Sequence, residues 1–268
     1  DLMYDIVMQW EWGNSERLDI YHDPETRKNS ISFRSNMARL AETLINEGKV
    51  EKAKDILDLA IEKMPLDYFG YYSLLVPFVD GYYRIGEIEK ARELSDNIAA
   101  KYSGRLNYFS SLDANLQYNL GEEIITEIER YRTLVEADLK HGETIELAPV
   151  LNQFIESIEP FRYLYGDYEF YTGLIDVAEG YFLDGQTALA QDLSNKISAE
   201  YDERLSLYSQ ISEDSQLQLS SRIQRELNNF NYVVQIVKAY DSTAFGDQIE
   251  GLFNKNLNVF SAILNSEE

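Results

Sequence analysis

Residues 81–110 read GYYRIGEIEKARELSDNIAAKYSGRLNYFS, and residues 180–209 read GYFLDGQTALAQDLSNKISAEYDERLSLYS. Aligned without a gap, the two stretches are identical at 12 of 30 positions, and their offset is 99 residues (185 − 86 = 99). Such agreement is far above what ordinary composition produces by chance. The chain therefore contains an internal repeat, and repeats of this length point to a helical-repeat architecture.

The repeat lies within two longer blocks, which we place at 68–166 and 167–268. Apolar residues recur at helical spacing over 122–139 and 143–165 in the first block, and over 217–240 and 248–264 in the second. The second helix of each copy is expected to run on through 102–112 and 201–211. No run alternates as a strand would. About ten helices packed as right-handed hairpins is the economical prediction.

Upstream of the repeat, Asp23–Glu25 reads as a helix start, with an N-cap side chain, a proline and an acidic residue in order. Large, small, glycine and proline positions then follow at the spacings of the tetratricopeptide signature. The matching residues are Met37, Leu40, Ala41, Leu44, Gly48, Ala53, Leu57, Ala60 and Pro65. Residues 23–67 thus resemble a tetratricopeptide unit.

This resemblance implies an all-α, tetratricopeptide-like right-handed α-solenoid, continuous from 23–67 through both four-helix blocks. Residues 1–22 have no sustained helical period and are predicted to form an extended arm. The arm holds both tryptophans, and we take Trp10, Trp12 and Asn14 as its candidate ligand contacts. Packing of the two rings onto the first helices is the alternative.

Composition limits the possible functions. The 268 residues are 44% hydrophobic, which is enough for a substantial core, and a net charge of −23 argues against a nucleic-acid partner. The absence of cysteine excludes disulfides and thiolate metal sites. The longest apolar run, near Leu74–Val79, is far shorter than the roughly 20 residues that span a bilayer, so no direct membrane insertion is expected.

Motifs for nucleophilic catalysis, phosphate binding and zinc helices are missing. His22 and His141 lie far apart in the sequence, near predicted turns, and are expected to be surface residues. Among 47 acidic residues, no catalytic pair can be selected without geometry. We therefore predict no catalytic residue, no metal and no cofactor.

A concave groove is the expected binding surface, because tetratricopeptide folds usually present the first helix of each hairpin on the concave face. Mapping the signature places three acidic residues at one inward position and two aromatic residues at another. The groove candidates are Glu42, Asp80, Tyr83, Arg84, Glu179 and Phe182. Such a groove favours a basic or polar–aromatic ligand over an acidic peptide tail. Solvated acids, and tyrosines that fill helix interfaces, are the alternative.

A second resemblance begins in the arm. Trp12-Gly13-Asn14, the tyrosine–aspartate stretch at 21–23 and the L-A-x-x-L-I-x-x-G-K-x-x-K-A pattern at 40–53 resemble the C-terminal soluble part of a bacterial membrane-protein family. The membrane half of that family is similar to protein-O-mannosyltransferase-type glycosyltransferases. The resemblance implies a periplasmic tail domain whose partner includes its own membrane domain. Because the chain begins with Asp1 and shows no leader, we expect a mature or excised piece.

Together these features predict a non-catalytic binding or assembly module that positions a protein or glycan partner. The alternative is a free-standing carbohydrate-binding or carbohydrate-processing helical protein, with tyrosines and carboxylates forming the site. An open groove favours the first, and a deep pocket with two converging carboxylates favours the second.

Overall fold

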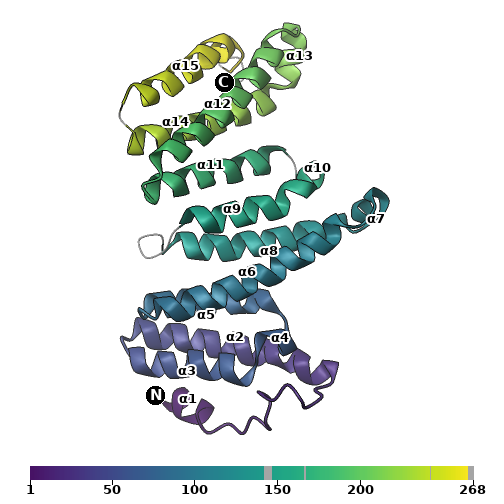
Figure 1. Cartoon of the computed structure of the whole chain (residues 1–268), viewed down its shortest axis with the longest axis vertical. Helices are drawn as coiled ribbons and strands as arrows, with labels where there is room; N and C mark the ends of the chain where they lie inside the picture. The colour runs from purple at the N-terminus through teal and green to yellow at the C-terminus, as the bar shows by residue number, and fades with distance from the viewer. Residues whose placement is uncertain (142–146, 166, 242, 265–268) are drawn as a thin grey trace. The chain divides into compact units, whose positions relative to one another are not determined.

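The computed structural model describes residues 1–141, 147–165, 167–241 and 243–264, and these residues form helices joined by short connections, without a strand (Figure 1). The all-α prediction is confirmed. The helices are α1 Leu2–Val7, α2 Pro24–Asn46, α3 Val50–Lys63, α4 Leu66–Phe69, η1 Tyr72–Leu75, α5 Val76–Arg84, α6 Ile88–Ser110, α7 Ala114–Asn119, α8 Gly121–Leu139, α9 Leu147–Ile158, η2 Glu159–Phe161, α10 Arg162–Tyr165, α11 Asp167–Leu183, α12 Thr187–Ser209, α13 Glu213–Gln218, α14 Ser220–Tyr240 and α15 Ala244–Leu264.

The predicted number of about ten helices is too low. Helices α1, α4, α7, α10 and α13 have only four to six residues each, which is too short for a helical period to show in the sequence. The predicted helix over 143–165 is in part outside the described residues, since 142–146 are not described, and its described part is α9, η2 and α10.

The chain divides into two compact units. Unit 1 comprises Asp1–Ser111 and Glu122–Ile145, and unit 2 comprises Leu112–Gly121 and Glu146–Glu268. Unit 1 therefore holds α1 to α6 and nearly all of α8, while unit 2 holds α7 and α9 to α15. These units are not the blocks 68–166 and 167–268, which follow the sequence repeat rather than compactness.

Helices α2 and α3 form the first hairpin of unit 1. The Asp23 carboxylate accepts hydrogen bonds from the backbone N–H groups of Glu25 (2.9 Å) and Thr26 (3.0 Å), so the predicted helix start is confirmed. Gly48 turns the chain with a φ of +73°, which an L side chain rarely adopts. The signature residues at the centre of the hairpin are at most 1% exposed, namely Met37, Ala41, Leu44, Ala53, Leu57 and Ala60.

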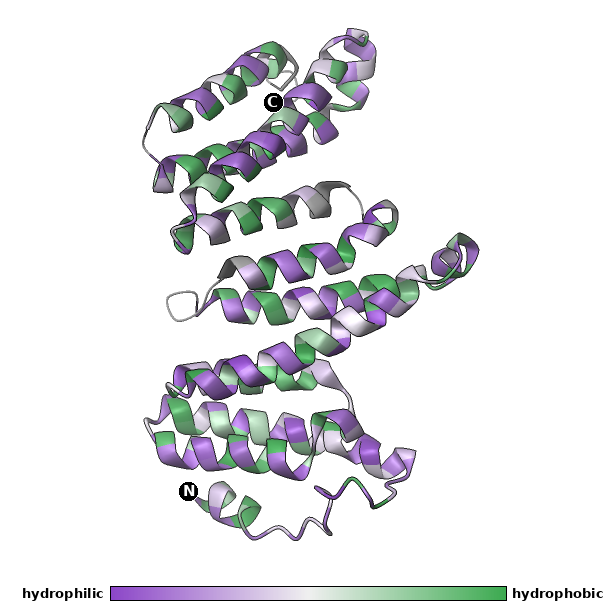
Figure 2. Ribbon diagram, viewed as in Figure 1, coloured by the Kyte–Doolittle hydropathy of each residue, from purple (hydrophilic) through white to green (hydrophobic). Residues whose placement is uncertain are grey.

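The same turn recurs in the repeated stretch. Gly86 joins α5 to α6 with a φ of +81°, and Gly185 joins α11 to α12 with a φ of +73°. Ala91 and Ala190, which follow these glycines, are fully buried. Figure 2 shows polar and apolar residues mixed along α6 and α12. Each hairpin therefore has a glycine in its turn and a buried alanine after it, where the two helices pack closely.

The helix bounds follow the sequence offset closely. Adding 99 to the bounds of α6 (88–110) gives those of α12 (187–209), and adding 99 to α7 (114–119) gives α13 (213–218). Helices α8 and α14 begin at 121 and 220, with the same offset. The two blocks therefore contain the same order of helices over this region, as the internal repeat predicts.

The N-terminal arm differs from its prediction. Leu2–Val7 is helical rather than extended, and Tyr4 and Asp1 connect this segment to α3. The Tyr4 hydroxyl donates to Asp55 over 2.5 Å, and Lys52 Nζ lies 2.8 Å from Asp1 Oδ1. Residues 8–23 run without a regular helix toward the start of α2 (Figure 1). In the described part of the chain, the helices lack the length and apolar character needed to cross a bilayer.

Candidate binding groove

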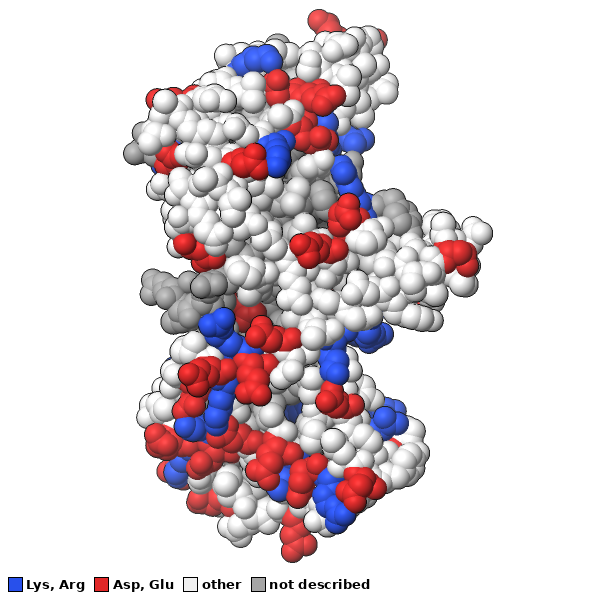
Figure 3. All heavy atoms as spheres, viewed as in Figure 1, with Lys and Arg blue, Asp and Glu red and all other residues white. Residues whose placement is uncertain are grey.

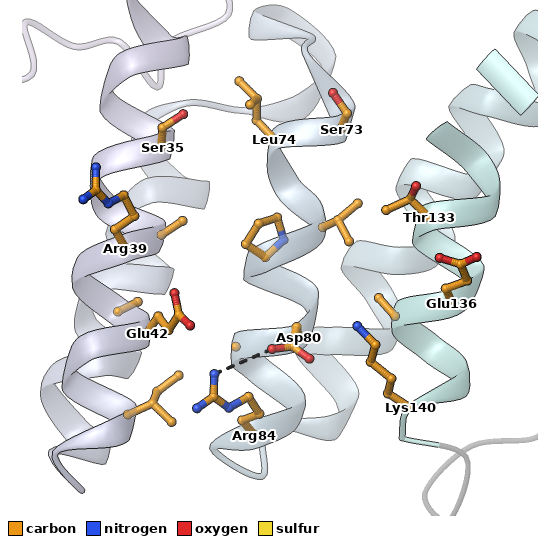
Figure 4. A pocket seen from close by; sticks show the side chains of 17 residues that line it. Ser35, Arg39, Glu42, Ser73, Leu74, Asp80, Arg84, Thr133, Glu136 and Lys140 are labelled. Atoms are coloured by element: carbon orange, nitrogen blue, oxygen red, sulfur yellow. Dashed lines mark ion pairs between the residues drawn. The ribbon is translucent and has the colours of Figure 1, made fainter. Parts of the chain in front are cut away.

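A groove of about 470 Å³ opens between α2, α5 and α8, all within unit 1 (Figure 4). We call it the α2–α5–α8 groove. Small and apolar side chains form much of its lining, including Ala38 and Ala41 from α2, Pro77 from α5 and Ala137 from α8. The small side chains leave space between three neighbouring helices, and Glu42 and Asp80 both line that space, as the tetratricopeptide mapping predicts.

Charged side chains from all three helices surround this apolar lining. Each of the three segments contributes one cation and one anion: the pairs are Arg39 and Glu42 on α2, Arg84 and Asp80 on α5, and Glu136 on α8 with Lys140 directly after its last residue. Figure 3 shows the same interleaving of acidic and basic side chains over the visible face of unit 1. The lining is therefore balanced in formal charge, although the whole chain carries −23. The expected preference for a basic ligand loses its basis here.

The charges on α5 are already engaged. Asp80 lies 3.8 Å from Arg84 and 3.1 Å from His141 Nε2, and Arg84 donates to the Asn46 side chain over 2.5 Å. Glu42 and Lys140 extend toward the Asp80–Arg84 pair from the two flanking helices (Figure 4).

Arg39, Glu42 and Lys140, in contrast, have no ion-pair or side-chain hydrogen-bond partner among the described residues. Two cations and one anion of the groove are thus available to a ligand.

Tyr83 does not belong to this groove, and its expected role as an exposed aromatic contact is wrong. The ring is 5% exposed and stacks on His141 with a centroid distance of 4.5 Å. Its hydroxyl donates to the buried carboxylate of Asp138 over 3.0 Å. Burial, with Asp138 nearby, raises the pKa of the Tyr83 hydroxyl well above its ordinary value. This tyrosine serves the packing of α5 against α8.

Asp138 is one of several buried acidic residues that the sequence did not reveal. It is 3% exposed and accepts hydrogen bonds from Tyr83 and from the Ser95 hydroxyl, the latter over 2.6 Å. Burial raises its pKa above the usual value, and the two donors oppose that shift by stabilising the carboxylate. An acidic residue among 47 carries no sequence signal of burial, apart from its place on the apolar side of the predicted helix 122–139.

Glu179 and Phe182 lie in unit 2 and are not among the residues that line the groove. Phe182 is 7% exposed and stacks on Tyr240 at 5.6 Å, so it too is a packing residue rather than an exposed contact. The Tyr240 hydroxyl donates to Glu179 over 3.3 Å. Of the six predicted groove residues, the structure therefore brings together Glu42, Asp80 and Arg84.

These contacts repeat at the 99-residue offset. In the first copy, the ring of His141 stacks on Tyr83 and its Nε2 lies 3.1 Å from Asp80. In the second copy, the ring of Tyr240 stacks on Phe182 and its hydroxyl donates to Glu179. Further contacts recur in the same way, at Arg105–Glu127 and Arg204–Glu226, and at Tyr102–Tyr131 and Tyr201–Phe230. His141 lies in the turn that its prediction expected and is half-buried there, because its ring occupies this repeated contact.

The arm candidates have three different roles. Trp10 and Trp12 pack against each other at 5.8 Å and against Phe33 of α2 at 5.4 and 5.7 Å, which fits the packing alternative. Asn14 is exposed and has a φ of +60°, so it serves a turn. Trp12 also lines a separate pocket between the arm and α2.

Metal ligands do not gather anywhere in the described part of the chain, since no three acidic or histidine side chains come together there. No protein-family profile matches the sequence, and no curated protein or solved structure is significantly similar to it.

Proposed function

We propose that this chain is a non-catalytic, tetratricopeptide-like helical-repeat binding module. In this proposal the α2–α5–α8 groove holds an extended segment of a partner protein that carries both positive and negative side chains. The observation that carries the proposal is the balanced charge of the groove, together with the three unpartnered charges on Arg39, Glu42 and Lys140.

The repeat pattern supports the class. Two hairpins in unit 1 and one in unit 2 close on a left-handed glycine, and the first helices of the two unit 1 hairpins, α2 and α5, line the groove. A helical-repeat solenoid characteristically offers such a surface for extended ligands. The partner segment would lie over Ala38, Ala41 and Pro77, where small side chains admit its backbone.

Electrostatics favours a mixed ligand over a uniformly charged one. A purely basic segment would be repelled by Arg39 and Lys140, and a purely acidic segment would be repelled by Glu42. Exposed ion pairs contribute only about 0–1 kcal/mol each, so the charges set register and the apolar lining supplies most of the affinity.

The bacterial membrane-protein resemblance supports one wider proposal. The chain would be the periplasmic C-terminal module of a multi-spanning protein with a glycosyltransferase-like membrane half, and the groove would hold a protein partner or acceptor for it. Sequencing upstream of the codon for Asp1 tests this directly. Several apolar stretches of about 20 residues would support it, and a start codon immediately before Asp1 would exclude it.

The groove itself is tested by fluorescence anisotropy with three labelled peptides. One alternates lysine and glutamate between alanines, the second replaces every glutamate by lysine, and the third does the reverse. We expect the mixed peptide to bind most tightly. The double substitution Arg39→Glu and Lys140→Glu should weaken it roughly tenfold, from two lost charge contacts.

Lys28→Glu is the matched control, because Lys28 lies on α2 outside the groove and is well exposed. It should leave the affinity unchanged. Equal binding of all three peptides, or equal loss in the control and the double variant, would show that the groove does not read charge.

A further inference from the structure

A second pocket, of about 310 Å³, lies between the N-terminal arm and the first turns of α2. We call it the arm pocket. It is separate from the α2–α5–α8 groove and shares no lining residue with it. The arm forms one side of it because the chain is tied down at both ends of this stretch. Ser15 donates to the Lys63 carbonyl over 2.6 Å, and the His22 backbone N–H donates to the Tyr68 hydroxyl over 2.6 Å.

Aromatic rings make up much of the pocket wall. Trp12 comes from the arm, Phe33 from α2 and Phe69 from α4. The Trp12 and Phe33 rings meet at a tilt of 58°, and His22 lies 5.7 Å from Phe69, so the rings are fixed by one another. Flat aromatic faces present weakly negative surfaces to the polarised C–H groups of a saturated ring.

The pocket hydroxyls can only accept further hydrogen bonds. Ser15 already donates to Lys63, Thr26 donates to Asp23 over 2.7 Å, and Ser30 donates to the Arg27 carbonyl over 2.6 Å. A hydroxyl has one proton and two lone pairs, so each oxygen retains acceptor capacity alone. A ligand that satisfies this wall must therefore bring donors.

Two further polar groups of the pocket can form hydrogen bonds with such a ligand. His22 Nε2 is a buried atom with no hydrogen-bond partner among the described residues, although its ring lines the pocket. A buried polar atom without a partner costs free energy, which a ligand that supplies one would recover. The Asn29 amide also lines the pocket and has no partner in the described structure, and it offers both a donor and an acceptor.

A ligand rich in hydrogen-bond donors can be a cation or a neutral molecule with hydroxyl groups, and the charge of the pocket distinguishes between them. Glu11 is the one charged side chain in the described pocket lining, and it is exposed to solvent. A bound cation would need a desolvated counter-ion, which Glu11 does not provide. Hydroxyl groups supply the same donors without a charge.

We infer that the arm pocket binds a neutral, hydroxyl-bearing ring of the saccharide class. One ring face stacks on Trp12 and Phe33, and its hydroxyls donate to the serine and threonine oxygens. Asn29 and His22 complete the set by bonding to the remaining hydroxyls. The proposal does not depend on what the α2–α5–α8 groove holds.

Tryptophan fluorescence can report binding in the arm pocket, because the two tryptophans of the sequence are Trp12, which lines the pocket, and Trp10, which packs against Trp12. We would titrate the whole chain with methyl glucopyranoside, methyl mannopyranoside and N-acetylglucosamine and follow tryptophan fluorescence. Tetramethylammonium chloride serves as the cationic probe. At least one neutral sugar should produce a saturable change, and tetramethylammonium should not.

Asn29→Ala and His22→Phe should each weaken that binding about tenfold, since each removes a hydrogen bond that a buried ligand makes. Phenylalanine keeps a ring against Tyr68 and Phe69, and Asn29 is exposed, so both variants are expected to fold. Asn36→Ala, at an exposed site on α2 outside the pocket, is the control.

Three results would overturn the inference. The first is no saturable response to any of the sugars in the tens of millimolar range. The second is saturation by tetramethylammonium alone, which would identify an aromatic cage for cations. The third is an equal loss of sugar binding in the Asn36 control and the Asn29 variant, which would place the sugar elsewhere.

Discussion

The buried hydrogen bond from Tyr83 to Asp138 should show strong energetic coupling between its two residues. At the 99-residue offset, Tyr83 corresponds to Phe182 and Asp138 to Val237, so the second copy lacks both the donor and the acceptor. Ser95 corresponds to Ser194, whose hydroxyl is buried without a hydrogen-bond partner among the described residues. The double variant Tyr83→Phe, Asp138→Val therefore converts the first copy to the chemistry of the second.

The magnitudes follow from which groups each variant leaves unpaired. Tyr83→Phe removes one hydrogen bond to a carboxylate and should cost about 1.5–3 kcal/mol. Asp138→Val leaves two buried hydroxyls, those of Tyr83 and Ser95, without an acceptor, at about 1–3 kcal/mol each. The double variant leaves only the Ser95 hydroxyl unpaired. The double variant should therefore lose less stability than the sum of the two single losses, by about 2.5–6 kcal/mol. This is the roughly 1.5–3 kcal/mol of the Tyr83 hydrogen bond, counted in both single variants, plus the roughly 1–3 kcal/mol of the Tyr83 hydroxyl that is no longer left unpaired.

Urea unfolding of the wild type, both single variants and the double variant measures this coupling. Both tryptophans lie in unit 1, so their fluorescence follows the unit that carries the change. The reasoning is refuted if the two single effects add to the double effect within about 0.5 kcal/mol.

Unit 2 offers the reverse exchange as a matched comparison. Val237→Asp places a carboxylate at a fully buried site, where Ser194 is the aligned donor. Adding Phe182→Tyr should restore part of the stability that the first substitution removes.

Three further predictions concern packing, turns and pH. Ala53→Leu should lower the free energy of unfolding by about 1–3 kcal/mol by overpacking a fully buried site, and thermal melting checks it; an unchanged melt would contradict the assigned register. Gly86→Ala should destabilise by about 1–3 kcal/mol because of its φ of +81°, whereas Gly104→Ala, within α6 with open space around it, should stabilise by up to about 1 kcal/mol. Burial raises the pKa of Asp138 in the folded chain, so the folded chain keeps the carboxyl proton at pH values above about 4, where the unfolded chain loses it. The free energy of unfolding should therefore fall as the pH rises from about 4 through the folded-state pKa, and the variant Asp138→Asn should not show this fall. Parallel pH profiles of the two proteins would refute this.

Long periodic elements were predictable from the sequence. The helix predicted over 122–139 is α8 at 121–139, and the extended second helices end at Ser110 and Ser209, close to the predicted limits. Short elements were not. Helices α7 and α13 have six residues each and depend on side-chain caps at Asp113 and Ser212, which a periodicity search does not register.

The candidate site was predictable in part for the same physical reason. Glu42 and Asp80 line one groove because their positions follow from helical register, which the tetratricopeptide signature fixes. Tyr83 was misjudged because register does not say how closely a third helix approaches, and α8 brings His141 and Asp138 onto the ring. The arm pocket depends on residues 8–23, where no periodicity exists to predict a path.

Two similar blocks in one chain create a problem of partner choice while the chain folds. The Arg105–Glu127 contact recurs as Arg204–Glu226, so this pair does not distinguish the correct helix from its copy. The exchange of Tyr83 and Asp138 for Phe182 and Val237 does. An α5 that paired with the wrong helix would bury the Tyr83 hydroxyl against valine, and the displaced Asp138 would lose the hydrogen bond that Tyr83 donates. A single buried hydrogen bond thus favours the correct pairing of helices over pairing with the other copy while the chain folds.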